Sequence, residues 1–242
     1  MMHKTLFYYC ILWFCCYPIH NSLAENPAPV SNGSLALQVE PYQSVYKGKY
    51  NGFSVTTRQQ LISQPGSHFW LLSNVVESFL GSIEETSLFN IENNQFLVSR
   101  YTYERSVLGK KRSQSISFDH QNGIALSEGE ETTRIPLTEN YFDTLSYQLA
   151  LREALSKGET DFQFKVIDKN KIKVYEFSCT GKEQLEINNK TYDTLRVIRV
   201  RENDKRKTTL WFSPSMDYLM VKLQQNEDGR EYSLELESYS RQ

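Results

Sequence analysis

The sequence predicts a mainly β protein, an antiparallel meander that forms a barrel or half-barrel, with one α-helix at about residues 143–157 packed on it. Three observations lead to this fold class. Hairpin signals recur along the chain with little else between them, aromatic residues make up 13% of it, and a single segment has clear helical periodicity. Strands separated by helices would instead have indicated a parallel sheet.

Residues 1–24 have the pattern of a secretory signal peptide. A short basic start precedes an apolar stretch at residues 6–19, which is shorter than the roughly 20 residues that span a bilayer. Small residues before the boundary predict cleavage after Ala24. We therefore expect an exported, periplasmic protein, with no transmembrane segment after cleavage. The alternatives are an uncleaved anchor and a lipoprotein, and the bulky Trp13 and Phe14 disfavour the lipoprotein.

The rest of the chain is expected to hold one folded unit. Residues 25–40 are rich in Pro, Ser, Asn and Gly and predict a flexible leader. Nothing after them resembles a linker, so residues 41–242 are expected to form a single β domain. The chain has 27 Lys and Arg against 29 Asp and Glu, and this slightly negative balance implies no general attraction to nucleic acid.

The strands follow from glycine positions and turn pairs. Residues 42–62 predict one long strand or a bent pair, because Gly48 and Gly52 interrupt the pattern. Residues 67–89 predict two strands around Gly81, with a helix as the alternative. Further hairpin turns are expected at Asn93–Asn94, Asn122–Gly123, Lys169–Asn170, Asn188–Asn189 and Asn203–Asp204.

The predicted helix has recognisable ends. Asp143 is a good N-cap, and Gly158 follows the last turn. The apolar residues between them recur at helical spacing: Leu145, Leu149, Ala154 and Leu155. A lone helix in a β meander is expected to plug the open mouth of a barrel or to cover one face of the sheet.

The C-terminal hairpin has a well-specified register. Asp228–Gly229 is a two-residue turn signal, since Gly adopts positive φ without strain. This turn aligns Leu223 with Leu234 on one face and Lys222 with Glu235 on the other. A slip by one residue would expose the aliphatic row to water, so we expect this pairing.

Two basic clusters are the candidate binding residues. They are Lys110, Lys111 and Arg112 at one expected hairpin tip, and Arg199, Arg201 and Arg206 on another hairpin. With a turn at Asn203–Asp204, Arg201 faces Arg206, and such like charges repel each other unless an anion lies between them. One interpretation is solvated tips that protect strand edges from aggregation. The other is a site for an anionic envelope component, such as a phospholipid or lipopolysaccharide head group.

No residue pattern predicts catalysis. The sequence has no G-x-S-x-G elbow, no Gly-rich phosphate loop and no H-E-x-x-H motif. His68 and His120 are far apart in sequence and are expected at the surface, and the Glu84–Glu85 pair is expected on a solvated edge. We therefore predict a protein that is not an enzyme, with no catalytic residue, metal site or cofactor.

Several segments together resemble the DUF3108 family (domain of unknown function 3108), whose members are exported bacterial proteins. The matching segments span residues about 42–239: "YKGKYNGFSV", "FDHQNGIAL", "FDTLSYQLALREAL", "VYEFSCTGKEQLEI", "KTYDTLRVIRV" and "WFSPSMDYLMVKLQQNEDGREYSLELESY". The resemblance implies an envelope-located protein with a mostly antiparallel β fold. It implies no reaction and no catalytic residues.

These observations favour a non-enzymatic binder or carrier of an amphipathic envelope ligand, held in a β half-barrel. The expected partner is a lipid, a lipopolysaccharide or another anionic envelope component. The alternative is an interaction module that pairs an exposed strand edge with an envelope protein. A hydrolase of an envelope polymer is the least favoured hypothesis, because no acid–base or nucleophile set is visible.

Overall fold

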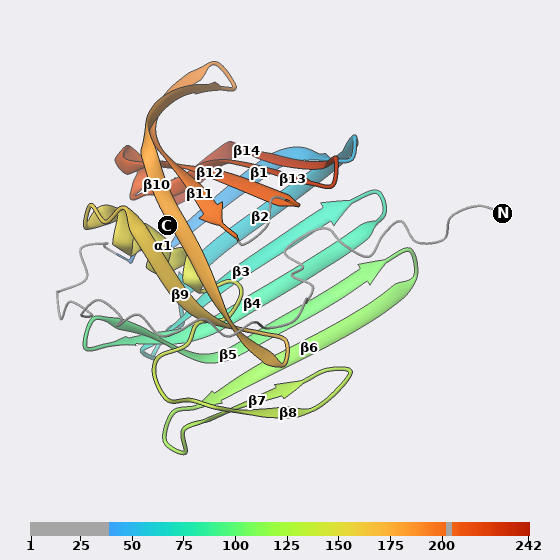
Figure 1. Cartoon of the computed structure of the whole chain (residues 1–242), viewed down its shortest axis with the longest axis vertical. Coiled ribbons are helices and arrows are strands. Elements are labelled where there is room, and N and C mark those ends of the chain that lie inside the picture. The colour runs from blue at the N-terminus through green and yellow to red at the C-terminus, as the bar shows by residue number, and fades with distance from the viewer. Residues whose placement is uncertain (1–38, 202–204) are drawn as a thin grey trace.

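The computed structural model describes residues 39–201 and 205–242, and their strands form one antiparallel sheet of fourteen strands (Figure 1). The predicted signal peptide, residues 25–38 of the predicted leader and the predicted turn at Asn203–Asp204 lie outside the described residues. The predicted fold class is confirmed. The sheet is rolled but not closed, which corresponds to the half-barrel alternative.

The N-terminal part of the sheet is a run of consecutive hairpins. Its strands are β1 (Tyr42–Tyr50), β2 (Phe53–Ser63), β3 (Phe69–Ser78), β4 (Gly81–Glu92), β5 (Gln95–Val107), β6 (Lys110–Asp119), β7 (Ile124–Glu128) and β8 (Thr133–Pro136). The turn at Asn51–Gly52 shows that residues 42–62 form a pair of strands. The two strands predicted around Gly81 are β3 and β4, and the turn predicted at Asn93–Asn94 is confirmed, with both asparagines at positive φ.

The C-terminal part follows the same plan after the helix. Its elements are β9 (Asp161–Asp168), β10 (Lys171–Ile187), β11 (Lys190–Val200), β12 (Arg206–Ser213), a short 3-10 helix η1 (Pro214–Met216), β13 (Leu219–Glu227) and β14 (Arg230–Arg241). The predicted register of the last hairpin is confirmed, because Leu223 pairs with Leu234 and Lys222 pairs with Glu235. The side chains of Lys222 and Glu235 form an ion pair of 2.8 Å.

The two parts meet where β1 pairs with β14, which makes one continuous sheet from both ends of the described chain. The order is β8-β7-β6-β5-β4-β3-β2-β1-β14-β13-β12-β11-β10-β9. The Lys47 ammonium lies 2.7 Å from a carboxylate oxygen of Glu237 across this pairing. The strands therefore run outward from a central seam, and β8 and β9 are the edges.

In the described sheet, no ladder joins the two edge strands, but segments near both edges contact each other. Phe142 forms an isolated bridge with Val166 of β9, and its amide donates to the Lys165 carbonyl at 2.9 Å. In β7, the strand next to the edge strand β8, the Ser127 hydroxyl donates to the carbonyl of Lys169 at 2.8 Å. These contacts stabilise the rolled shape of the sheet, although the sheet does not close into a barrel.

The helix α1 (Tyr147–Ser156) begins later than predicted. Asp143 does not cap its first turn. Its carboxylate accepts hydrogen bonds from the amides of Leu145 and Ser146, at 2.7 and 2.8 Å, and so caps the turn that leads into the helix. No described helix is long and apolar enough to cross a membrane.

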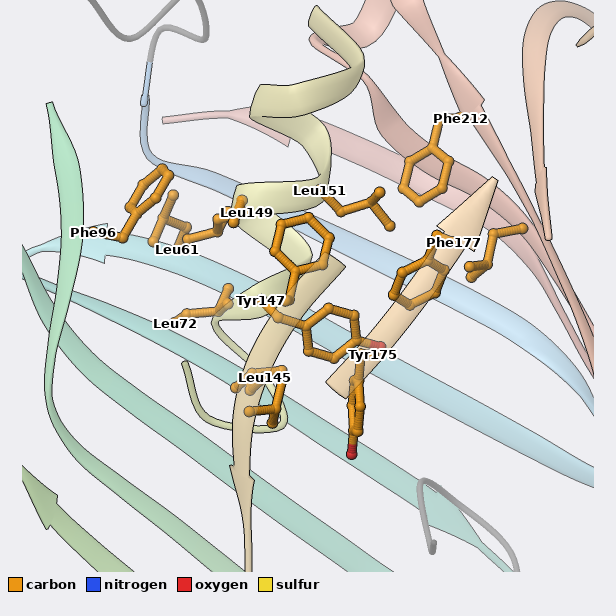
Figure 2. Packing of buried hydrophobic residues seen from close by; sticks show 14 of the residues in the cluster. Leu61, Leu72, Phe96, Leu145, Tyr147, Leu149, Leu151, Tyr175, Phe177 and Phe212 are labelled. Carbon is orange, nitrogen blue, oxygen red and sulfur yellow. The ribbon is translucent and has the colours of Figure 1, made fainter. Parts of the chain in front are cut away.

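The helix lies inside the rolled sheet, where it fills the interior between distant strands (Figure 2). Its Tyr147 ring meets Tyr175 of β10 edge-on, with centroids 5.2 Å apart, and stacks on Phe177 at 5.8 Å. Leu149 and Leu151 are 1% exposed and belong to the same apolar cluster. The prediction that one helix packs on the sheet is therefore confirmed.

Candidate functional site

Three of the predicted binding residues meet in the interior of the roll. Arg199 lies near the end of β11, Arg201 follows two residues later on the same side of the chain, and Arg206 begins β12. Arg206 is 9% exposed, and all three side chains line one pocket. The sequence placed these arginines on a hairpin, and the structure shows that their side chains face the interior of the rolled sheet.

The Arg199 guanidinium lies over an aromatic surface. Its central carbon is 3.6 Å from the centroid of the Tyr175 ring and 5.5 Å from that of Phe177. A cation held over a ring face is attracted by the electrons of the ring. The aromatic residues of β10 therefore fix the position of this charge at the pocket wall.

The other two arginines contact each other and a neighbouring carboxylate. Arg206 forms an ion pair with Glu227, and Arg201 donates from Nη1 to the Arg206 carbonyl at 3.2 Å. Burial, with the charges of Arg199 and Arg206 adding to it, lowers the pKa of Arg201 to about 9. Burial also lowers the pKa of Arg199. In both cases burial disfavours the charged guanidinium, and a bound anion would favour it.

The pocket around this arginine cluster (Arg199, Arg201 and Arg206) is amphipathic. It holds about 1090 Å³ of empty space, counting the part open to solvent. Apolar and aromatic side chains make up much of its wall: Tyr42, Tyr46, Val76, Tyr147, Leu149, Leu151, Phe177, Leu210, Phe212, Leu219, Met220, Leu223, Tyr232 and Leu234. Uncharged polar side chains complete it: Thr57, Gln59, Asn74, Gln148, Thr208 and Gln225. Such a pocket fits a ligand with an acidic group and an apolar body.

Arg152 of α1 also lines the pocket and was missed by sequence reasoning. It donates from Nε and Nη2 to the Asp217 carbonyl, at 3.0 and 2.9 Å, and its guanidinium lies 5.1 Å from the Tyr42 ring centroid. Its spacing from Leu145 and Leu149 gave a usable signal, because residues three and four positions apart share a helix face. The helix thus closes one side of the pocket and contributes a cation to it.

The second predicted cluster is separate. Lys110, Lys111 and Arg112 lie at the start of β6, after the β5–β6 turn, and none of them lines the arginine pocket. Arg112 forms an ion pair with Glu130 at 3.1 Å. The structure therefore divides the predicted binding residues into an interior group and a group at a hairpin tip.

A buried acidic pair lies beside the pocket. Glu85 is 2% exposed and accepts hydrogen bonds from the hydroxyls of Tyr101, at 2.6 Å, and Thr144, at 3.3 Å. Burial raises its pKa to about 7, and the nearby charge of Asp143 adds to the shift. The expectation that both members of the Glu84–Glu85 pair are solvated is wrong for Glu85, because successive residues on a strand face opposite sides.

The titratable side chains in the described wall of the pocket are arginines and tyrosines. Among the described residues, no Asp, Glu, His, Cys or Ser lines it. His68 and His120 are exposed. In the described ranges, no group of three or more His, Cys, Asp or Glu is arranged to hold a metal ion.

Fold and pocket together define an open, barrel-like protein whose single sheet wraps around a helix and an arginine-lined pocket. The chain belongs to the family described as "Protein of unknown function (DUF3108)", whose profile matches residues 46–235. This confirms the resemblance seen in the sequence.

A solved structure shares the fold. It is a beta-barrel-like protein of the domain of unknown function DUF1849 from Brucella abortus, with a TM-score of 0.58 and 6% sequence identity. The similarity covers 85% of this chain and 99% of that one. At this identity the likeness shows the architecture alone. No curated protein matches the chain.

Proposed function

We propose that this protein is an exported, periplasmic binder or carrier of an amphipathic envelope ligand with an acidic group. The observation that carries the proposal is the position of Arg199, Arg201 and Arg206 in the wall of an otherwise mostly apolar and aromatic pocket. The arginines would hold the acidic group by charge-assisted hydrogen bonds, and the leucine and aromatic side chains would cover the apolar body. Lipids and lipopolysaccharides of the envelope combine these two features.

Binding is tested with a fluorescent fatty acid, dansyl-undecanoic acid, as the probe. The double substitution R199M/R201M is expected to weaken its binding by about a hundredfold or more, since each charged hydrogen bond contributes about 1.5–3 kcal/mol. Methionine keeps much of the apolar volume of arginine. The measurement is a fluorescence titration, with thermal unfolding as a check that the variant is folded.

The matched control is K110M/K111M, which removes two cations outside the pocket and is expected to leave probe affinity within about twofold. A parent protein that does not bind the probe would contradict the proposal. So would a pocket variant that is folded and binds it as tightly as the parent.

Export is a separate part of the proposal and rests on the residues before the described part of the chain. The measurement is the mass of the protein recovered from the periplasmic fraction of a Gram-negative host. We expect the mass to correspond to a chain that starts at Glu25, since cleavage is predicted after Ala24. An intact chain found in the cytosol would contradict this prediction.

Native mass spectrometry of that material distinguishes the ligand binder from the strand-edge alternative. A co-purifying lipid supports the carrier, and a co-purifying protein supports the interaction module. The described edge strands offer little backbone to which a partner strand could hydrogen-bond. The edge strand β8 has four residues including Pro136, which cannot donate a ladder hydrogen bond, and Phe142 already contacts β9.

A further inference from the structure

Three neighbouring hairpins place apolar side chains in water at one end of the sheet. The β1–β2, β3–β4 and β5–β6 turns lie along the right-hand side of Figure 1. Phe79 is 92% exposed, Leu108 is 61% exposed and Phe53 is 48% exposed, one for each hairpin. We call these three turns with their exposed side chains the apolar rim. Single exposed apolar residues are common, but three on adjacent tips form a surface that needs an explanation.

The turn positions themselves are unusual for apolar residues. Phe79 and Leu80 occupy the whole two-residue turn between β3 and β4, and Leu108 has φ 50°. Hairpin turns favour Gly, Asn and Asp, because bulky residues adopt positive φ at a cost. At the opposite end of the sheet, the chain follows that rule with Asn93–Asn94. Position 108 therefore keeps an exposed apolar side chain in a conformation that asparagine would adopt with less strain.

The tips are held in a fixed arrangement. The Leu108 amide donates to the Leu80 carbonyl at 3.0 Å, which joins the β5–β6 tip directly to the β3–β4 tip. Successive strands lie about 4.8 Å apart, so neighbouring hairpins present their tips about 10 Å from each other. A rigid row of this kind meets a flat surface at several points at once.

Positive charge lies directly behind the tip that carries Leu108. Lys110 and Lys111 are exposed, and they follow Gly109 at the start of β6. Arg112, the next residue, forms an ion pair with Glu130. Apolar side chains at a tip with lysines behind them match a bilayer surface, where the side chains enter the interface and the cations meet anionic head groups.

We propose that the apolar rim docks this protein on the surface of a bilayer that contains anionic lipids, with Phe79 and Leu108 inserted at the head-group level. This goes beyond ligand binding in the arginine pocket, and Phe79, Leu108, Lys110 and Lys111 do not line that pocket. Val76 lines both the arginine pocket and a smaller hollow beneath the rim, beside Phe53 and Leu80. A docked rim would therefore bring lipid close to the pocket.

The first test follows the tip itself, so that any apolar segment at the N-terminus does not affect the readout. The substitution F79W places an indole at the most exposed apolar position, and the spectrum of the parent protein subtracts the native tryptophans. With vesicles of phosphatidylglycerol and phosphatidylcholine, its emission is expected to shift to shorter wavelength and to resist quenching by iodide. The control V174W alters a residue of β10 that is 51% exposed and away from the rim, and no shift is expected.

The second test measures vesicle binding by co-sedimentation. F79S/L108N is expected to weaken binding by about tenfold or more, and asparagine accepts the positive φ of position 108. K110Q/K111Q is expected to reduce the preference for phosphatidylglycerol by about tenfold, and high salt is expected to do the same. R199M/R201M alters the pocket and is expected to leave vesicle binding unchanged, so that failure of the pocket proposal and failure of this one are distinguishable.

The docking proposal is overturned if the indole of F79W stays open to iodide in the presence of vesicles. It is also overturned if F79S/L108N binds vesicles like the parent. A rim variant that instead loses a co-purifying protein, with no effect of vesicles on F79W, would assign the rim to a protein partner.

Discussion

The substitution Gly48→Val is expected to lower the free energy of unfolding by more than about 4 kcal/mol, or to prevent folding. Gly48 lies in β1, where it pairs with Val55 of β2 on one side and Leu234 of β14 on the other. A Cβ atom at this position would lie 1.7 Å from the Ser233 carbonyl oxygen and 2.9 Å from the Leu234 Cα. Both are backbone atoms of the neighbouring strand, so a side-chain rotation cannot relieve the clash.

The position of Gly48 in the sheet makes this clash costly. The β1–β14 pairing joins the eight N-terminal strands to the six C-terminal ones. A β-bulge between Val45 and Tyr46 already bends this part of the seam. Forcing the two strands apart here would open the sheet at its centre, and the interior packing around the helix depends on both halves.

The measurement is urea unfolding followed by far-ultraviolet circular dichroism. Gly52→Asn in the same hairpin is the matched control, because no atom lies within 4 Å of a Cβ there and asparagine tolerates its φ of 84°. We expect Gly52→Asn to change stability by less than about 1 kcal/mol. A Gly48→Val variant that unfolds at the urea concentration of the parent would show that the seam is looser than described.

Local signals made the hairpins predictable. Turn pairs such as Asn188–Asn189 adopt the positive φ values that their residue types favour, and alternation then fixes which side chains face inward. The helix was predictable for the same reason, since its periodicity lies within one short segment. Its start was misplaced because Asp143 caps the preceding turn, and a cap in sequence does not reveal how many residues later the helix begins.

Contacts between distant segments were not predictable. Lys47 and Glu237 are 190 positions apart, and no local pattern indicates that β1 lies beside β14. The arginine cluster depends on the same long-range order. Arg199 and Arg201 continue the alternation of the buried Val197, so their inward direction could have been inferred from phase. The sequence pattern was instead interpreted as exposed hairpin tips, because arginine is mostly exposed in folded proteins.

The stability of the protein is expected to fall as the pH rises from about 4.5 to about 7, and Glu85 is expected to be a main cause. In the fold this carboxyl has a pKa raised to about 7, first by burial and then by the charge of Asp143, whereas an ordinary glutamate titrates near 4.5. Between these values the folded state holds a proton that the unfolded chain has released. Raising the pH through this window therefore favours unfolding, by on the order of 3 kcal/mol.

The substitution Glu85→Gln tests this directly, because glutamine stays neutral at every pH of the window and keeps an oxygen for the Tyr101 hydroxyl. We expect the free energy of unfolding of the variant to change far less between pH 5 and pH 8 than that of the parent, as measured by urea unfolding at each pH. The control is Glu84→Gln, which alters the exposed neighbour and should retain the parent's pH dependence. Burial also raises the pKa of Asp143, so a smaller decline of the same sign is expected to remain in Glu85→Gln. If Glu85→Gln loses as much stability between pH 5 and pH 8 as the parent does, the buried proton resides on another group.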